Sequence, residues 1–353
     1  MIPILYESTE KSFNSNGICR LYDCTRCEVT EERNGVYEIE FDYPVDGPHF
    51  NEIIPGRIIA VEHDETGNTQ PFDIYGYSKP IAGVVTFMAH HVSYRLSNTT
   101  VTGSNISTLS GAFALFANST PENPFSFTTD ISTNNYIAAA DGLPHTIREM
   151  LGGIEGSILD AYRCEYEWDK WIVKVWRERG EQKDFTVRYG VNLVDYNEEL
   201  DFSDTYNAVI PYWANEDNGT RTIISGSMVN SGAPGFGNRI NCRPLDLTDK
   251  FESQPTAAQL ESMAASYLAS NTPYNPAQNI TINFVEVQDS DIEKALSGLK
   301  KFGLCDSIRV VLPRYGINAW YKIVKVVWDV LAERYMEMEL GNLSTTLSEA
   351  LGL

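Results

Sequence analysis

Short runs in which apolar and polar residues alternate dominate the first hundred residues. Residues 36–43 follow the pair Asn34-Gly35 and alternate with a period of two, as expected for a half-buried strand of a hairpin. Similar runs follow at short intervals, at residues 57–62, 72–78 and 84–91. Several short strands joined by tight turns predict a small barrel or sandwich in this part of the chain.

Helical spacing enters the pattern between residues 101 and 190. Residues 106–118 carry apolar side chains at helical intervals, and residues 144–151 can also form a helix. Strand alternation returns in residues 165–176, which predict a hairpin that turns at Asp169-Lys170. We therefore expect this portion to mix helix and sheet.

The second half of the chain alternates strands with a few helices. Thr256, with Gln259 three residues later, predicts a capped helix that ends before Pro273. Further strands are predicted at residues 207–213, 221–228, 280–284, 307–312, 320–329 and 334–340, with a short helix at 291–301. The run at 320–329 is nearly continuous in apolar residues, which predicts a buried strand.

Composition places the chain among folded proteins of more than one domain. It has 353 residues, of which 42% are hydrophobic and 11% aromatic, and domains usually take roughly 100–200 residues. No apolar stretch approaches the roughly 20 residues that cross a bilayer, so we expect no membrane insertion. The six cysteines are expected to remain free thiols.

The formal net charge of −21 arises from 48 acidic and 27 basic residues spread along the chain. A surface that binds the phosphate backbone of nucleic acids needs clustered lysine and arginine, so specific nucleic-acid binding is not expected. The acidic balance can simply keep the protein in solution. Alternatively, it can form an acidic surface that repels nucleic acid passing nearby, because the phosphate backbone carries the same sign of charge.

Cysteine motifs give only a weak signal for metal or redox chemistry. Cys24 and Cys27 form a CxxC with Cys19 nearby, but no second CxxC or CxxH follows at a suitable distance, and no βαβ pattern surrounds the pair. The plainer interpretation is two small residues on an early strand.

Histidine, serine and glycine motifs of known enzymes are also missing from the sequence. The histidines are His49, His63, His90, His91 and His145, and none forms an HExxH or a pair four apart on a helix. His90 and His91 point to opposite faces of a strand and cannot share a metal. The glycine-rich residues 152–156 predict a helix stop. We therefore predict no catalytic, cofactor-binding or metal-binding residues.

Several ordered stretches resemble one family of phage proteins. Residues 152–169, followed by Arg179-Gly180 and residues 187–193, are similar to the middle signature of the prophage tail endopeptidase or phage minor structural protein family. Residues 29–41 are similar to its first hairpin. Near the end, residues 304–308, 333–335 and 339–342 are similar to its closing strands. The resemblance spans nearly the whole chain.

This resemblance implies a multi-domain, β-rich α+β fold like the hub of a phage baseplate, with two small antiparallel β-barrels and two mixed α/β domains. The corresponding boundaries are 1–100 for the N-terminal barrel, 101–190 for an α/β domain, 191–228 with 305–344 for the second barrel, 229–304 for an inserted α/β domain, and 345–353 for a C-terminal tail.

The resemblance also implies a structural role in the virion. The expected protein is a homotrimeric ring that closes the tail tube and docks the distal tail protein and the tape-measure protein. It would be made in the bacterial cytoplasm and end at the tail tip. Although the family name includes an endopeptidase, only a short tail follows the last predicted strand, and we expect no enzyme activity and no cofactor.

Two alternatives to a structural role stay open from the sequence. One is a cell-wall endopeptidase or other peptidoglycan hydrolase within these residues. The other is a receptor- or carbohydrate-binding module, for which the aromatic residues Trp168, Trp171 and Trp176 are candidates. Trp168 and Trp176 have the same parity on the predicted hairpin, which favours packing of one on the other.

Overall fold

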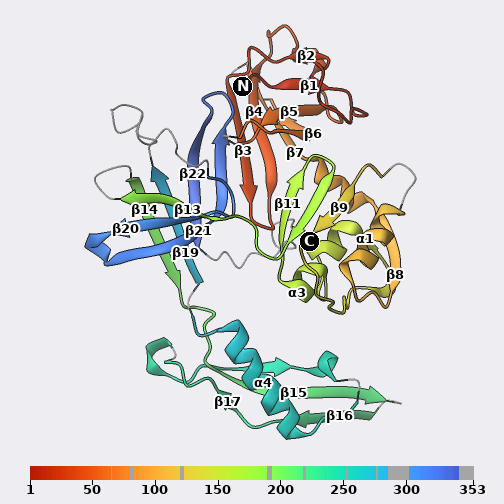
Figure 1. Ribbon diagram of the computed structural model, residues 1–353, viewed down its shortest axis with the longest axis vertical. Coiled ribbons are helices and arrows are strands. Elements are labelled where there is room, and N and C mark those ends of the chain that lie inside the picture. The colour runs from red at the N-terminus through yellow and green to blue at the C-terminus, as the bar shows by residue number, and fades with distance from the viewer. Residues whose placement is uncertain are drawn as a thin grey trace. The chain divides into compact units, whose positions relative to one another are not determined.

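A computed structural model describes residues 1–341 except 65, 80, 82, 120–122, 189–192, 218–219, 235, 252, 276 and 285–301 (Figure 1). The chain forms two compact units: unit 1 is Met1–Asn197 with Ile280–Leu353, and unit 2 is Glu198–Asn279. The predicted helix at 291–301 and the predicted tail at 345–353 lie outside the described residues. The finer division into four domains stays a prediction.

The N-terminal part of unit 1 is built of strands. They are β1 (Ile4–Tyr6), β2 (Cys19–Arg20), β3 (Arg26–Glu32), β4 (Tyr37–Pro44), β5 (Ile58–Glu62), β6 (Thr69–Ser78) and β7 (Val84–His91), with the 3₁₀ helices η1 (Phe50–Glu52) and η2 (Val92–Asn98). The strands predicted at residues 36–43, 57–62, 72–78 and 84–91 are thereby confirmed.

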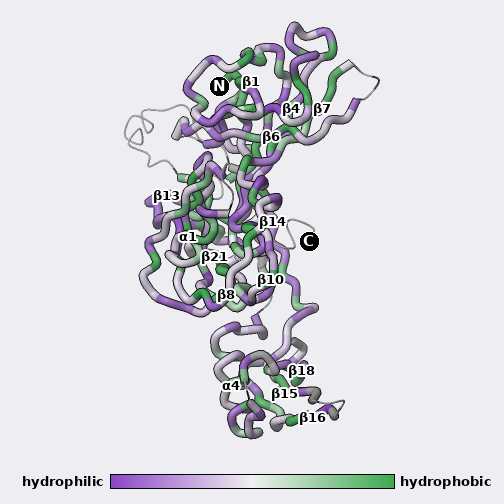
Figure 2. The backbone as a smooth tube through the Cα atoms, turned by 90° about the vertical axis from the view of Figure 1, so that its right-hand side faces the viewer, coloured by the Kyte–Doolittle hydropathy of each residue, from purple (hydrophilic) through white to green (hydrophobic). Residues whose placement is uncertain are grey.

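Period-two alternation determines which side chains of these strands are buried. Along β4, buried residues such as Ile39 and Phe41 alternate with more exposed acidic ones, and Figure 2 shows the same alternation of hydrophobic and hydrophilic positions. Asn34 adopts a positive φ of 58° in the turn between β3 and β4, a conformation that asparagine tolerates better than most residues. The predicted hairpin is therefore present.

The middle of unit 1 mixes short helices with two small sheets. Its elements are β8 (Thr100–Ser104), α1 (Leu109–Ala117), β9 (Ser126–Thr129), β10 (Asp141–Thr146), α2 (Ile147–Gly152), α3 (Ile158–Tyr162), β11 (Glu165–Asp169) and β12 (Ile172–Trp176). The helix predicted at 144–151 begins three residues late, because Pro144 pairs with β8 in β10 and Thr146 caps α2. The helix stop predicted at residues 152–156 is confirmed.

One long strand connects the two predicted barrels. The remaining strands of unit 1 are β13 (Gln182–Arg188), β20 (Ser307–Leu312), β21 (Ile317–Asp329) and β22 (Arg334–Gly341), with η5 (Pro313–Tyr315), while β14 (Leu193–Asp201) and β19 (Ala277–Phe284) cross the boundary between the units. The first half of β21 pairs with β20 and its second half with β3. Strands from both predicted barrels therefore belong to one sheet, whereas the strands at 208–217 and 220–225, also assigned to the second predicted barrel, lie in a separate sheet of unit 2.

This large sheet is mixed and its pairing path is open. Its order in the described residues is β14-β19-β22-β21-β3-β4-β7-β6-β5-β1-β2, with β13 parallel to β20 beside β21. The path does not close on itself within the described part of the chain, so the β-rich α+β fold is present without two separate closed barrels being visible in the pairing.

Unit 2 is a small sheet covered by one helix. Its elements are β15 (Ala208–Asp217), β16 (Thr220–Ser225), β17 (Val229–Asn230), β18 (Cys242–Asp246), α4 (Ala257–Asn271), η3 (Phe236–Asn238) and η4 (Thr248–Lys250). Thr256 and Gln259 form the predicted capping box of α4. Leu260, Ala264 and Leu268 on α4 are buried, and they pack against the β15 side chains Val209 and Trp213.

Among the described residues, no helix is both long enough and apolar enough to cross a bilayer.

Candidate functional site

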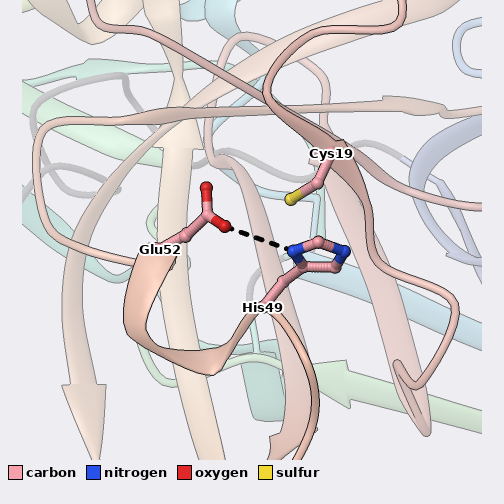
Figure 3. A group of neighbouring side chains, drawn as sticks. All are labelled: Cys19, His49 and Glu52. Atoms are coloured by element: carbon pink, nitrogen blue, oxygen red, sulfur yellow. Dashed lines mark hydrogen bonds and ion pairs between the residues drawn. The ribbon is translucent and has the colours of Figure 1, made fainter.

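Two clusters of charged or metal-ligating side chains stand out in unit 1. The first, called here the junction network, consists of Glu31, Arg33, Glu165, Arg179 and Lys322. It lies where the β3–β4 hairpin, the start of β11, the segment after β12 and the long strand β21 meet. The second, called the Cys19 cluster, consists of Cys19, His49 and Glu52 (Figure 3).

Glu165 is the centre of the junction network. Its carboxylate accepts hydrogen bonds from the Lys322 ammonium at 2.7 and 2.8 Å, from the Arg33 guanidinium at 3.2 Å, and from the backbone N–H of Arg179 at 2.6 Å. Only 8% of the Glu165 surface is exposed. A carboxylate with three donors and two cationic partners is already fully bonded and has no free position for a ligand.

Arg179 links the same network to the N-terminal sheet. Its Nη1 donates to a Glu31 carboxylate oxygen at 3.0 Å and to the Tyr166 carbonyl oxygen at 3.1 Å. Burial by itself lowers the pKa of Arg179, but Glu31 and other nearby acids outweigh it and hold that pKa above its ordinary value. The Glu31 side chain is 4% exposed and the Arg179 side chain only 15%, so the pair acts as a structural joint.

The Cys19 cluster assembles from two segments thirty residues apart. Cys19 begins β2 and is held by pairing with Leu5 of β1. His49 and Glu52 lie at the start and end of η1, where residues three apart project on the same side of a 3₁₀ turn. The next residue, Ile53, is buried in the core and anchors this turn.

Candidate ligand atoms of these three side chains converge. One atom from each of Cys19, His49 and Glu52 lies within 4.8 Å of the others. His49 Nδ1 is 3.3 Å from Glu52 Oε1, and Figure 3 shows the Cys19 sulfur pointing toward both groups. The side chains of His49 and Glu52 are 38% and 41% exposed, so solvent reaches a cluster whose sulfur side is buried.

The electrostatics of the Cys19 cluster do not favour a free nucleophile. Burial raises the pKa of the Cys19 thiol, Glu52 raises it further, and Arg57 offsets part of the rise. Nucleophilic cysteines need a lowered pKa, because the thiolate is the reactive form. Sulfur, imidazole nitrogen and carboxylate oxygen are, however, the three ligand types that zinc accepts in proteins. The arrangement therefore suits cation binding better than covalent catalysis.

Comparison with known proteins now bears on the fold and the family. Residues 181–351 match the model of the prophage endopeptidase tail family. Over this stretch, which is just under half of the chain, the protein is similar to that family. The resemblance predicted from the sequence is thereby confirmed. No curated protein matches the chain.

Solved prophage tail proteins share the fold along nearly the whole chain. The prophage tail protein gp18 from Listeria monocytogenes EGD-e has a TM-score of 0.61 at 14% identity, covering 100% of this chain and 98% of that one. The 43 kDa tail protein of prophage MuSo2 from Shewanella oneidensis has a TM-score of 0.61 at 12% identity, covering 96% and 98%. The tail protein from Neisseria meningitidis MC58 reaches 0.59 at 11%, covering 99% and 98%.

Within this prophage tail fold, the CxxC cysteines lie in the hydrophobic core. Cys24 is 8% exposed and Cys27 is fully buried on β3, and burial together with the neighbouring Cys24 raises the pKa of Cys27 well above its ordinary value. In the described part of the chain, neither thiol joins a group of three metal-ligating side chains. The interpretation of small residues on an early strand is confirmed for Cys27.

Adjacent histidines behave as their strand parity predicts. His90 is half-buried and stacks between Tyr75 and Tyr94, whereas His91 faces the core, where its Nε2 lies 3.2 Å from Gln70 Oε1. The two rings are on opposite faces of β7.

The prediction that Trp168 packs on Trp176 is wrong. Across this hairpin, even-numbered residues pair with odd-numbered ones: Glu165 pairs with Trp176 and Trp168 pairs with Val173, which places the two indoles on opposite faces. Trp168 is buried and lies under the Arg148 guanidinium. The indole N–H of Trp176 donates to Glu167. Trp168 is therefore not available to bind a carbohydrate.

Sequence reasoning missed the Cys19 cluster. Metal-binding histidine motifs usually place ligands four apart on an α-helix, whereas His49 and Glu52 are three apart on a 3₁₀ turn. A weak signal was present in that spacing. The contribution of Cys19 depends on tertiary folding and could not be read from the sequence.

Proposed function

We propose that the chain is a structural hub protein of a phage tail tip, acting as a homotrimeric ring that closes the tail tube and docks the distal tail protein and the tape-measure protein. The observation that carries this proposal is the tail-protein fold, shared over 96–100% of the chain with three solved tail proteins, two of which are described as prophage proteins. The similarity of residues 181–351 to the prophage endopeptidase tail family supports it.

An open end of the large sheet supports assembly. In the described part of the chain, one end of the pairing path is β2. Unpaired strand edges invite pairing with another chain, and a closed ring of three copies would cover them. In this proposal, the strands on either side of β21 act as the two barrel-like bodies of each subunit, and three copies present six such bodies to the tail tube.

Exposed apolar side chains at one end of the N-terminal sheet support a contact surface there. Val45 after β4, Tyr75 and Tyr77 on β6, and Ile81 in the β6–β7 turn are each at least 45% exposed. The register pairs Pro44 with Val84 and Ser78 with Thr86, so Val45, Tyr77 and Ile81 lie at the same end. Such a group of exposed apolar residues is typical of a protein interface.

The proposal is tested by the mass of the particle in solution. Light scattering of the chain, alone and mixed with the distal tail protein from the same gene cluster, is expected to show a trimeric assembly. The double substitution Tyr77→Asp with Ile81→Asp is expected to leave a folded chain that assembles poorly. Tyr136→Asp, at an exposed residue in the middle of unit 1, is the matched control. A wild-type monomer under both conditions would contradict the proposal.

We further propose that this role involves no catalysis. In the described residues, the buried carboxylate of Glu165 is fully bonded, and the Cys19 thiol has a raised pKa. Purified protein is accordingly expected to leave peptidoglycan uncut. Release of soluble muropeptides from purified cell walls would instead favour the hydrolase alternative.

The acidic balance is consistent with a channel that passes DNA without binding it. With a net charge of −21, carboxylates facing the lumen of the ring would repel the phosphate backbone. Electrophoresis with duplex DNA at low salt is expected to show no complex. Binding that weakens steeply with added salt would contradict this part of the proposal.

A further inference from the structure

We propose that Cys19, His49 and Glu52 form a zinc site in the N-terminal sheet of unit 1. The proposal is independent of the hub function, because it depends only on these three side chains and on the two segments that hold them.

Geometry is the first argument for the site. Zinc–ligand bonds of about 2.0–2.3 Å in a tetrahedron place neighbouring ligand atoms roughly 3–4 Å apart. The imidazole nitrogen and the carboxylate oxygen of the cluster are already 3.3 Å apart, and all three candidate atoms lie within 4.8 Å. A small rotation of side chains is enough to bring the ligands onto one ion, with solvent as the fourth ligand.

The two segments that present the ligands are firmly held. The backbone N–H of Ile18 donates to Leu5 at 2.7 Å, which holds β2 at Cys19. On the other segment, Arg57 Nη1 donates to the Glu52 carbonyl oxygen at 2.7 Å. Ligands that are already held in position reduce the loss of conformational entropy on metal binding.

Charge is the second argument. A bound zinc ion adds two positive charges, and the Glu52 carboxylate with the Cys19 thiolate supplies two negative ones. The thiol proton leaves for solvent as the sulfur–zinc bond forms. Arg57 is the cation that opposes binding, but its Nη2 is 3.2 Å from Glu7, so an acid outside the ligand set already balances its charge.

Ligand chemistry favours zinc over calcium or magnesium. Hard cations prefer oxygen donors, whereas one sulfur, one nitrogen and one oxygen form a set of zinc type. The His49 imidazole nitrogen and the buried Cys19 sulfur together account for the preference for zinc.

Cobalt and zinc binding to the full chain test the site. Protein stripped with a chelator is titrated with Co²⁺, and one ion per chain with a cobalt–thiolate charge-transfer band is expected. Zinc should displace the cobalt and bleach the band. Cys19→Ser should remove the band. His49→Gln should weaken zinc binding by more than the roughly 10–100-fold that losing an outer-shell partner costs.

Matched controls separate this site from adventitious binding. Cys242→Ser removes an exposed thiol in unit 2. His145→Gln removes the histidine that pairs with Asp141 at 3.1 Å, an ion pair comparable to His49–Glu52. Both variants should bind like the wild type. The proposal is overturned if the wild-type chain takes up no cobalt, or if folded Cys19→Ser binds zinc as tightly as the Cys242→Ser control. Circular dichroism of each variant verifies folding.

Discussion

The junction network and the Cys19 cluster contain similar kinds of side chain but differ in how far those groups are already bonded. In the junction network, Glu165 accepts from three donors, and Arg179 has both an acid and a carbonyl as partners. In the Cys19 cluster, His49 and Glu52 share one bond at 3.3 Å and remain partly exposed. Buried charged groups that already make all their hydrogen bonds hold chain segments together. Side chains that converge and still have unused lone pairs can bind a ligand.

This difference also explains why neither cluster resembles an enzyme centre. The junction network has no position left for a substrate, and the Cys19 cluster lacks an activated thiolate. The first cluster therefore contributes to the joining of β3, β11 and β21, and the second offers a place for an ion.

Removing Arg179 tests whether the junction network is a structural joint. Arg179→Met leaves Glu31 buried without its main partner, and loss of one partner of a buried pair costs about 3–5 kcal/mol in the free energy of unfolding. Urea unfolding followed by tryptophan fluorescence suits this measurement, because five of the six tryptophans belong to unit 1. Exposed Arg177→Met is the control and should change stability by at most about 0.5 kcal/mol. Equal effects of the two substitutions would contradict a structural joint at Arg179.

Substituting Cys27 tests whether the CxxC belongs to the buried core and not to the metal site. Cys27→Ser places a hydroxyl in a fully buried apolar site, which should cost about 1–3 kcal/mol in unfolding free energy. Zinc affinity should not change, because Cys27 is not one of the three ligands. Loss of zinc binding by the folded variant would move the metal site from Cys19 to the CxxC.

Acid should weaken unit 1 through buried His91. Burial, with the nearby charges of His63 and Arg148, holds the pKa of His91 well below its ordinary value. Below about pH 6.5 the unfolded chain therefore binds a proton at this histidine, whereas the folded chain does not. The free energy of unfolding keeps its full value above about pH 6.5 and falls below it. One such proton gives a loss of at most about 1.4 kcal/mol for each pH unit.

The control for this pH effect is His49, which lies in the open cluster. His91→Gln should flatten the decline of stability between about pH 6.5 and 5, measured by unfolding at each pH, whereas His49→Gln should leave most of it in place. A decline of the same slope in His91→Gln would show that other groups cause it.

The smallest expected effect is on the metal-free Cys19 cluster. Glu52→Gln removes a half-exposed ion pair with His49 and should change the unfolding free energy of zinc-free protein by at most about 1 kcal/mol. In wild-type protein, zinc at a hundred times its dissociation constant should add about 2.7 kcal/mol. Thermal melts with and without zinc measure both quantities. A gain of the same size in Glu52→Gln would remove Glu52 from the ligand set.

Local patterns predicted the elements of this fold well. Alternation identified β4, and the capping pair Thr256 and Gln259 identified the start of α4, because both signals depend on neighbouring residues. The double pairing of β21 was not predictable, since nothing in its apolar run says that one half pairs with β20 and the other with β3. A long apolar strand indicates burial but does not identify its partners.

Long-range clusters lay beyond the reach of sequence patterns for the same reason. Glu165 and Lys322 are 157 residues apart, and Cys19 lies thirty residues before His49. With 48 acidic residues, a sequence offers too many possible pairs to choose among. Only the family resemblance could indicate a tail protein, and it conveyed no information about either cluster.

The most direct test of the hub proposal is to count this chain in assembled tails. Tail particles released by induction of the host's prophage can be purified and their proteins quantified by mass spectrometry against the tail-tube protein. The proposal predicts three copies of this chain per tail, and antibody labelling in the electron microscope at one tip. Absence of the chain from purified tails, or labelling along the whole tube, would contradict it.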